Sequence, residues 1–422
     1  MMKMHYPKLD ETVYRCKLSC GLDVAVVPKP GFTRKLAYFV TDFGSIHTDF
    51  RLDGREYHVP AGVAHYLEHK LFELPGRDVS AEFAALGANV NAFTGYDMTA
   101  YYFSCTENFD KSLELLLEFV STPYFPAESV VREQGIIDQE IGMYLDSPEA
   151  RVFDRLMEAM YRRHPIRVPI LGSRESIREI TPEILELCHR AFYAPGNMIL
   201  CVVGDVDPEK VVQAAEKVLG SEPRAVAEKI RHWPEEMTCP EPVTQQQMEV
   251  AMPTFQLGFK CEATPAGEAA IRGEIVGDLA AEALFGESSA LYLQMYESGL
   301  IDASFGGGFE TVDGGAMITC GGDSPEPEKV RDAILDGVKT LLETGMDDDS
   351  FLRMKRSALG RRIRDLDSFD STCFRICAYH FSQFDYFRFP AVYAEVTWEE
   401  VCEFLTQVVT EDRCALSVIT PM

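Results

Sequence analysis

Two histidines and a glutamate stand close together in residues 65–69, which read His-Tyr-Leu-Glu-His. In a helix, residues four apart share one face with Cβ atoms about 5–6 Å apart, so His65 and His69 can bind one Zn²⁺. Glu68 would lie on the same face. Zinc lowers the pKa of a water molecule that it binds to about 7, and a neighbouring carboxylate can take the proton. This H-x-x-E-H spacing reverses the H-E-x-x-H pattern of zinc hydrolases and predicts hydrolytic chemistry.

A helix is expected here because apolar residues form a stripe beside the candidate ligands: Val63, Ala64, Leu67, Leu71 and Phe72. Histidine is scarce, with 9 in 422 residues, which favours a functional pair over a structural pair on a solvated helix face. A catalytic zinc site takes three protein ligands and leaves one position open. A third ligand must therefore come from elsewhere in the chain.

A second amphipathic helix is expected at residues 133–144. Glu133 and Glu140 are seven residues apart, which is two helical turns, so both carboxylates project from one face. Another side of this helix carries three residues suited to a core: Ile136, Ile137 and Ile141. Taken alone, the two glutamates are better explained as part of a solvated helix face.

With both segments in view, the chain resembles the pitrilysin/insulinase zinc peptidases, and within them the half-sized bacterial two-subunit branch. In that family the third ligand is a glutamate seventy-odd residues after the second histidine, with another glutamate seven residues before it. Here 140 − 69 = 71 and 140 − 133 = 7. The resemblance implies that His65, His69 and Glu140 bind one Zn²⁺ per chain, with Glu68 as catalytic base and Glu133 as a supporting carboxylate.

A further match to the family is the segment Asn91-Ala92-Phe93-Thr94, followed by a strand-like run at residues 99–103. In the resembled family this segment is a sheet edge beside the zinc, and a substrate peptide adds to it as an extra strand. The resemblance therefore implies that these four residues bind substrate. On residue types alone, a buried strand that ends in a turn explains the segment as well.

Composition narrows the class of protein further. A chain of 422 residues with 46% hydrophobic residues suggests two domains of about 200 residues each. Its formal charge of −27 argues against nucleic-acid binding and against anionic membrane surfaces. No apolar run of 18 residues or apolar signal core is present, and twelve scattered cysteines read as reduced thiols. We therefore expect a cytoplasmic protein without a membrane span.

An internal repeat divides the chain in two. The segment that begins at Thr181 resembles the one at Thr397, an offset of 216, and Leu-Asp-Ser at 145–147 recurs at 366–368, an offset of 221. Residues 221–248 are rich in Pro and Glu and are expected to be a linker between domains 1–220 and 249–422. The predicted fold class is α+β. The resemblance implies two homologous domains, each with an antiparallel-rich sheet packed with helices, that form half of a clamshell chamber.

The second half is predicted to lack a metal site. Aligning Leu-Phe at 71–72 with Leu-Phe at 284–285 places three residues opposite His65, Glu68 and His69, in that order: Asp278, Ala281 and Glu282. The Leu-Asp-Ser alignment places Arg361 opposite Glu140. A cation at a ligand position would repel zinc, so the second half is expected to support the first.

The chain departs from the family at a pair of residues that contact substrate, and this departure suggests a partner chain. Active members carry an Arg and a Tyr, seven apart, that contact substrate near the scissile carbonyl. Here Tyr296 stands where the Arg is expected, and Asp302 or Ala303 stands near the Tyr. In two-subunit relatives one chain carries zinc and the other carries this pair. We therefore expect a homologous partner without zinc, or else a homodimer.

The predicted function is that of a zinc metalloendopeptidase subunit that cleaves peptides or flexible protein segments. The main alternative is a non-proteolytic scaffold or maturation partner that retains the fold. The ligands alone would also suit a zinc hydrolase of non-peptide amides.

Overall fold

The computed structural model describes all 422 residues and contains two large sheets. The strands of the first, a seven-stranded sheet, are β1 (Met2–Tyr6), β2 (Glu11–Lys17), β3 (Asp23–Pro28), β4 (Lys35–Thr41), β9 (Asn89–Thr94), β10 (Thr99–Cys105) and β11 (Met198–Gly204). Those of the second, a five-stranded sheet, are β13 (Val243–Met248), β14 (Thr254–Cys261), β15 (Gly306–Val312), β16 (Gly315–Asp323) and β17 (Cys414–Pro421).

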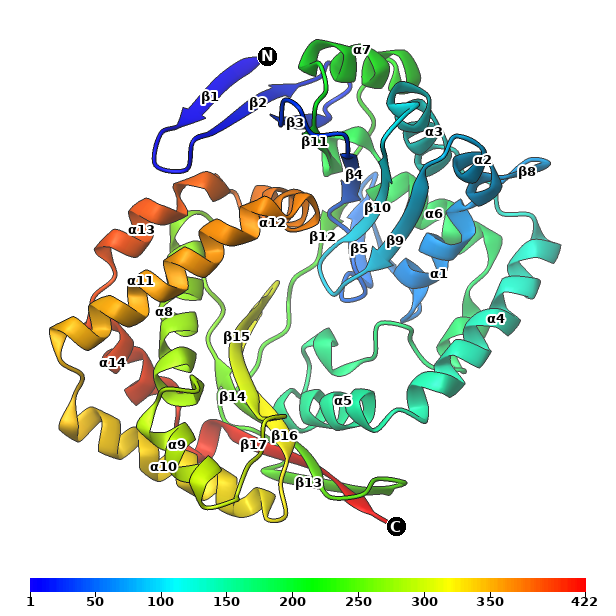
Figure 1. Ribbon diagram of the computed structural model, residues 1–422. Helices are drawn as coiled ribbons and strands as arrows, with labels where there is room; N and C mark the ends of the chain where they lie inside the picture. The colour runs from blue at the N-terminus through cyan, green and yellow to red at the C-terminus, as the bar shows by residue number, and fades with distance from the viewer. The chain divides into compact units, whose positions relative to one another are not determined.

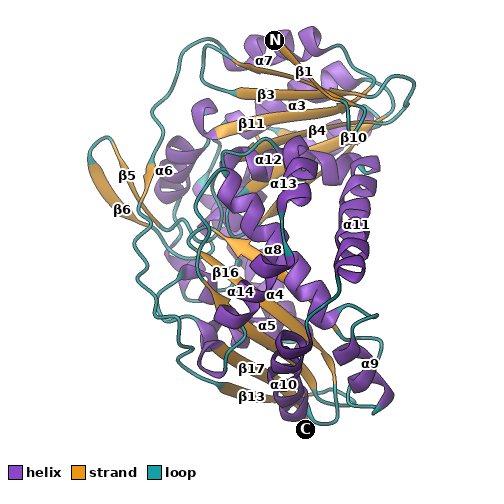
Figure 2. Ribbon diagram, turned by 90° about the vertical axis from the view of Figure 1, so that its left-hand side faces the viewer, coloured by secondary structure: helices purple, strands orange, loops and turns teal.

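Five strands of the first sheet, β3-β11-β4-β10-β9, have the same topology as the second sheet, and β1 and β2 extend the first sheet further. The strand orders of the two sheets are β1-β2-β3-β11-β4-β10-β9 and β13-β17-β14-β16-β15. In the first sheet β3 pairs with β11 in parallel, and in the second β13 pairs with β17 in parallel, whereas the other pairings are antiparallel. Figure 2 shows β3, β11, β4 and β10 side by side in that order. The predicted α+β fold with two homologous, antiparallel-rich sheets is confirmed.

Fourteen α-helices accompany the sheets (Figure 1). Those before the second sheet are α1 (Val63–Leu71), α2 (Val79–Ala85), α3 (Phe109–Ser121), α4 (Ala127–Leu145), α5 (Pro148–Met160), α6 (Pro182–Phe192) and α7 (Pro208–Leu219). The others are α8 (Glu268–Phe285), α9 (Ala290–Glu297), α10 (Pro327–Thr344), α11 (Asp348–Arg364), α12 (Phe369–Phe381), α13 (Phe389–Glu395) and α14 (Trp398–Val408). None of them is both long enough and apolar enough to cross a bilayer.

Strand β11 shows how the first sheet is buried. Its sequence, Met-Ile-Leu-Cys-Val-Val-Gly, is a continuous apolar run, and all seven residues are buried. Such runs are typical of strands covered on both faces. Leu200 and Val202 belong to the core that includes residues of α1, α3, α6 and α7. Helix α12 also packs on β11 and β4, and both of its cysteines are buried there.

The compact units of the structure are not continuous in sequence. Unit 1 comprises Met1–Ile141, Pro169–Arg231 and Ile363–Arg388, and unit 2 comprises the remaining residues. Helix α12 therefore belongs to the unit of the first sheet, and α5 belongs to that of the second, where it packs on β14 and β17. One boundary between the units, at Arg231/His232, lies within the predicted linker at residues 221–248. The units differ from two continuous domains because a helix from each half of the chain completes the other unit.

The internal repeat corresponds to matching helix starts. Thr181 and Thr397 are the N-caps of α6 and α14, where their side chains accept the backbone N–H of Ile184 and Glu400. Ser147 and Ser368 cap α5 and α12 in the same way. Ser and Thr are favoured at N-caps because the side-chain oxygen satisfies an N–H that has no partner within the helix. The repeated residues thus mark repeated helices.

The predicted linker contains regular structure. β13 (Val243–Met248) forms an edge of the second sheet, and β12 (Glu228–Lys229) joins β5 (Asp49–Leu52) and β6 (Arg55–His58) in a small sheet. A further hairpin pairs β7 (Glu73–Leu74) with β8 (Arg77–Asp78). β13 was not evident from the sequence because its Thr-Gln-Gln-Gln core carries few apolar residues. Its backbone pairing with β17 holds it in place instead.

Candidate metal centre

Helix α1 carries the H-x-x-E-H residues and begins directly after Gly62, which has a φ of +91°. A Cβ atom at this position would lie 2.5 Å from the carbonyl oxygen of Leu171, so only glycine fits. His65 and Glu68 are 7% and 9% exposed, and the apolar residues of the predicted stripe lie on the core side of the helix. The predicted helix is confirmed, and it holds the three polar side chains at the margin of the core.

His65 and His69 of α1 meet Glu140 of α4. The Nε2 atom of His65 lies 3.7 Å from Glu140 Oε1, and the Nε2 atom of His69 lies 3.7 Å from Glu140 Oε2. All three candidate ligand atoms lie within 4.8 Å of one another, and no other group of three His, Cys, Asp or Glu residues does so. A separation of 3.7 Å is too long for a hydrogen bond. Bonds of about 2.1 Å to a tetrahedral zinc put two ligand atoms roughly 3.4 Å apart, so the observed spacing suits a shared ion.

The donor chemistry of this group also fits zinc. Two imidazole nitrogens and one carboxylate are a common ligand set of catalytic zinc, which leaves a fourth position open. Burial, with a contribution from nearby His69, lowers the pKa of His65 to about 4, so this imidazole is neutral and able to donate its lone pair. Its Nδ1 atom is buried without a hydrogen-bond partner. Unlike His69, His65 therefore has no protein hydrogen bond at its second ring nitrogen.

Glu133 holds His69 in the orientation that a ligand needs. His69 Nδ1–H donates to Glu133 Oε1 over 3.0 Å, which directs Nε2 toward Glu140. The hydrogen bond to His69 lowers the pKa of Glu133 and keeps it a carboxylate. Burial alone would lower the pKa of His69, but Glu133 and the nearby Glu68 together raise it. A carboxylate behind a metal-binding imidazole is typical of zinc sites, so the geometry suits the expected supporting role of Glu133.

Glu68 lies beside the candidate ligands His65, His69 and Glu140 but is not one of them. Thr94 Oγ1–H donates to Glu68 Oε2 over 2.7 Å, so one carboxylate oxygen is fixed from strand β9. Burial raises the pKa of Glu68, although the hydrogen bond from Thr94 opposes the shift. A carboxyl group whose pKa moves toward neutrality is better suited to accept and release a proton during catalysis.

Strand β9 contains all four residues expected to bind substrate. It is the outermost strand of the first sheet and pairs only with β10, so its other edge has no strand neighbour. Asn91 Oδ1 accepts the backbone N–H of Ala92 over 2.8 Å. The ring of Phe93 lies 6.0 Å from that of Phe374 on α12. The predicted sheet edge is confirmed, and it lies next to Glu68 through Thr94.

Helix α4 carries a further carboxylate between Glu133 and Glu140. This residue, Asp138, forms an ion pair with Arg174 at 3.5 Å and is not a member of the donor group. Ile137 and Ile141 are buried as expected, but Ile136 is 49% exposed, so its predicted place in the core is wrong. It follows Gly135, which is itself exposed, and the face that α4 buries is narrower than three isoleucines suggest.

In the second half an ion pair stands where the first half brings its ligands together. Arg361 lies 2.9 Å from Glu282, and these positions align with Glu140 and His69. The next residue, Arg362, lies 2.6 Å from Glu274 and 3.0 Å from Asp278, the position aligned with His65. Guanidinium groups here pair with carboxylates at positions that align with candidate ligands of the first half.

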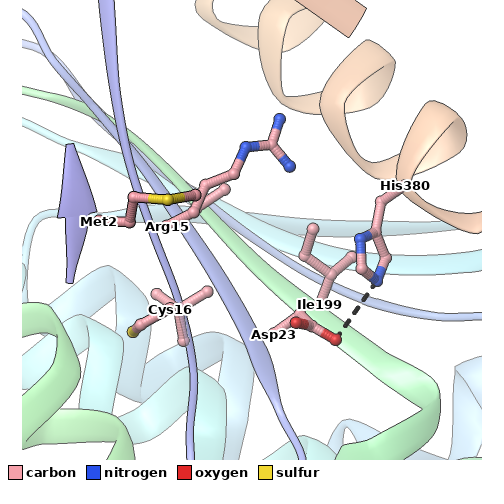
Figure 3. A pocket seen from close by; sticks show the side chains of 8 residues that line it. Met2, Arg15, Cys16, Asp23, Ile199 and His380 are labelled. Carbon is pink, nitrogen blue, oxygen red and sulfur yellow. Dashed lines mark ion pairs between the residues drawn. The ribbon is translucent and has the colours of Figure 1, made fainter. Parts of the chain in front are cut away.

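A separate hollow in unit 1, of about 260 Å³, lies between the ends of β2 and β3 and helix α12 (Figure 3). His380 of α12 faces Asp23 at 3.6 Å, and Lys17 lies 2.7 Å from the same carboxylate. Arg15 also lines the hollow but pairs with Asp385 at 3.4 Å. Its charged groups are paired within the protein, and no residue of the metal group lines it.

Comparison with known proteins agrees with this geometry. Residues 55–174 match the family model described as "Insulinase (Peptidase family M16)", and residues 179–358 match "Peptidase M16 inactive domain". The chain is 36% identical to "Uncharacterized zinc protease YmfH" of Bacillus subtilis (strain 168), over 99% of both chains.

Solved structures show the same relationship. A putative M16-like peptidase from Alicyclobacillus acidocaldarius superimposes with a TM-score of 0.93 at 33% identity, over 98% of this chain and 99% of the other. A protease from Helicobacter pylori shares the fold, with a TM-score of 0.83 at 19% identity over 97% of this chain and 99% of that one. Fold and donor group thus define an insulinase-like protein. The chain belongs to peptidase family M16.

Sequence reasoning missed several side chains that hold this site together. It gave Thr94 a role at the substrate edge but not its bond to Glu68. It also passed over Tyr66, Lys70 and Ser129, which join α1 to α4. A lysine within an otherwise apolar helix stripe was a signal for such a contact, because a buried lysine needs a partner.

Proposed function

We propose that this chain is the zinc-bearing subunit of a metalloendopeptidase. The observation that carries the proposal is the convergence of His65 Nε2, His69 Nε2 and the Glu140 carboxylate within 4.8 Å. Glu68 stands beside this group, held by Thr94 from the sheet edge. The relatives named zinc proteases support zinc as the metal. His65, His69 and Glu140 would hold one Zn²⁺ per chain.

Zinc bound there would supply a Lewis acid that polarises the scissile carbonyl and acidifies water. Thr94 occupies Oε2 of Glu68, which leaves Oε1 to accept a proton from the attacking water. The water oxygen bonds to the carbonyl carbon, and Glu68 passes the proton to the amine nitrogen as the C–N bond breaks. Glu133 keeps His69 oriented throughout. One water molecule is consumed for each peptide bond cleaved.

The proposed substrate is an extended peptide or a flexible protein segment. Strand β9 offers an unpaired edge beside Glu68, where main-chain hydrogen bonds would align a peptide with little demand on its sequence. Such an edge accepts only a chain that can become a strand, which favours unfolded segments over folded domains. We also propose that the two domains form half of an enclosed chamber.

The second half supports a paired arrangement. Tyr296, at the position where the family carries an arginine, is 47% exposed and stacks on Tyr292 with ring centroids 5.9 Å apart. Asp302 accepts the backbone N–H of Ser304 over 2.8 Å. Neither residue supplies a cation for the substrate carbonyl. We therefore propose that a homologous chain, or a second copy, completes the site. The twelve unpaired cysteines support a cytoplasmic location.

An alternative function is that of a non-proteolytic scaffold or maturation partner. The substitutions at Tyr296 and Asp302 favour it, as does the match of residues 179–358 to a domain described as inactive. The intact donor group argues against it, because a scaffold has no physical need for two imidazoles and a carboxylate directed at one point.

Metal analysis followed by peptide hydrolysis separates the two functions. The purified chain, alone and with proteins co-purified from its native host, would be assayed for zinc and for cleavage of a fluorogenic peptide. A peptidase binds one zinc and loses its activity with a chelator. Zinc-loaded protein that cleaves no peptide in any of these preparations would support the scaffold.

A further inference from the structure

Helices α1 and α4 are also joined by a buried lysine. Lys70 is 1% exposed, and its Nζ donates to Glu73 Oε2 over 2.6 Å and to Ser129 Oγ at the start of α4. Ser129, itself 3% exposed, donates to the same carboxylate of Glu73. Burying an ammonium ion is costly unless it is paired and hydrogen-bonded, so these contacts hold Lys70 firmly. The result is a fixed link from α1 to α4.

A second contact joins the same two helices. Tyr66, which is fully buried, donates its Oη–H to the backbone carbonyl of Val130. Tyr66 and Lys70 directly follow the two histidines of α1, and Ser129 lies four residues, or about one turn, before Glu133 on α4. The bonds of Tyr66 and Lys70 thus fix the two helices beside the residues that must meet the metal.

The second half of the chain provides an internal comparison. The alignment that sets Glu282 against His69 sets Ala283 against Lys70 and Gly286 against Glu73. The alignment that sets Arg361 against Glu140 sets Met354 against Glu133, while Ser350 still corresponds to Ser129. The lysine and its carboxylate are therefore absent from the half that has no metal ligands. There the Arg361–Glu282 ion pair joins α8 to α11 directly.

We propose that Lys70 is a positioning residue for the metal centre. Its bonds to Glu73 and Ser129 set the spacing and rotation of α1 against α4, and so the distance from His69 Nε2 to Glu140. This inference rests on the proposed function, because it assumes that the group binds a divalent ion. It does not assume that the protein hydrolyses peptides. Its test therefore measures the metal itself.

The experiment compares metal binding in folded variants. Lys70→Met combined with Glu73→Gln removes the buried cation and the carboxylate paired with it together. We expect this double variant to bind Zn²⁺ about 10–100-fold more weakly, as supporting residues of metal sites do. The visible absorption spectrum of Co²⁺ bound at the same group should also change, because it reports the geometry of the ligands. Lys70→Arg, which keeps a cation, should restore part of the affinity.

Two controls separate positioning from stability. Lys217→Met removes a lysine that is paired with Glu114 on the surface of the same unit, and it should change neither affinity nor spectrum. Val26, on strand β3, is fully buried. Val26→Ala leaves a small cavity and should lower the stability of the protein, yet it should leave the Co²⁺ spectrum unchanged. If the double variant does not fold, Ser129→Ala tests the proposal instead. This variant should weaken Zn²⁺ binding several-fold.

Wild-type affinity and spectrum in a folded Lys70→Met/Glu73→Gln variant would overturn the proposal. If the double variant does not fold, unchanged Zn²⁺ binding in Ser129→Ala would also overturn the proposal. Wild-type protein that binds zinc but cleaves no peptide would refute the proposed function and leave the measurement on Lys70 intact. Wild-type protein that binds neither Zn²⁺ nor Co²⁺ would overturn both.

Discussion

Thr94 of strand β9 donates a hydrogen bond to Glu68 of helix α1, with Oγ1 and Oε2 2.7 Å apart. The bond connects the edge proposed to bind substrate to the carboxylate proposed as base. A peptide aligned on β9 would thereby be placed relative to the proton acceptor by one side chain. Catalytic rates fall steeply when reacting groups are misplaced by about 1 Å, so this bond has a direct consequence for turnover.

Thr94→Val should lower kcat by about 10-fold while zinc content stays at the wild-type level. The substitution keeps the shape of the side chain but removes the only hydroxyl bonded to Glu68. Thr94→Ser keeps the hydroxyl and should retain most of the activity. Steady-state hydrolysis of a fluorogenic peptide, beside metal analysis of each variant, provides the measurement. Equal kcat in wild type and Thr94→Val would show that Glu68 is oriented by other groups.

Removing any of the three proposed ligands should strip the metal. We expect His65→Ala, His69→Ala and Glu140→Ala to lose zinc, whereas Glu133→Ala should only weaken binding, by roughly 10–100-fold. Inductively coupled plasma mass spectrometry of dialysed protein measures this directly. Asp138→Ala is the matched control from the same helix, since that carboxylate pairs with Arg174. Stoichiometric zinc in Glu140→Ala would require a different third ligand.

The candidate metal ligands and Glu68 were more predictable from the sequence than the residues that hold helices α1 and α4 together. His65, Glu68 and His69 lie within one helical turn, and Glu133 and Glu140 within two, so helix periodicity alone sets their faces. Helices α1 and α4 were predictable for the same reason, because their apolar residues recur at regular spacing. Strand β10 was predictable from its run of β-forming residues, Thr-Ala-Tyr-Tyr-Phe. The family resemblance then joined α1 to α4, which no local pattern could do.

Long-range packing explains what sequence reasoning missed. Helices α5 and α12 are both amphipathic, and their patterns do not say which of two similar sheets each one covers. The Lys70–Ser129 contact joins residues 59 positions apart, and its only local signal is a cation among apolar neighbours. β13 gains its place through backbone pairing with β17, which a polar sequence does not reveal.

Glu235 should make the stability of unit 2 depend on pH in the acid range. Its carboxylate accepts backbone N–H bonds from residues 162–164 and an ion pair from Lys260, whose side chain is 1% exposed. Burial alone would raise the pKa of Glu235, but these bonds lower it from 4.5 to about 2. The stabilisation is therefore complete above about pH 4.5 and is lost as the pH falls toward 2.

Glu235→Gln removes the charge that compensates Lys260 and should lower the free energy of unfolding at pH 7 by about 3 kcal/mol. The loss of stability between pH 4.5 and 2 should also be shallower than in wild type. Urea unfolding at a series of pH values measures both effects. Glu228→Gln, which breaks an exposed pair with Arg51, is the control and should change stability by less than about 1 kcal/mol. Identical pH profiles for Glu235→Gln and wild type would contradict the assigned pKa shift.

The isolated chain should be a weak peptidase. With Tyr296 and Asp302 or Ala303 at the positions of the expected pair, the proposed site lacks the two side chains that would fix the far side of the carbonyl, and lost positioning costs on the order of 10²-fold in rate. Adding a homologous chain that carries the Arg and Tyr should restore turnover. Titrating that chain against a fixed amount of this protein, with peptide hydrolysis as the readout, gives the stoichiometry. Full activity in the partner-free protein would point instead to a homodimer or to other residues.

Glu68→Gln tests the central claim most directly. Glu68 is beside the metal group and not within it, so the variant should retain one zinc per chain. Without a base, turnover should fall by about 10²–10⁴-fold relative to wild type in the same preparation. The decisive measurement is the rate of peptide hydrolysis per bound zinc. A zinc-loaded Glu68→Gln protein with reduced turnover of this size is the predicted result, whereas full activity, or loss of the metal, would contradict the assignment of Glu68 as the general base.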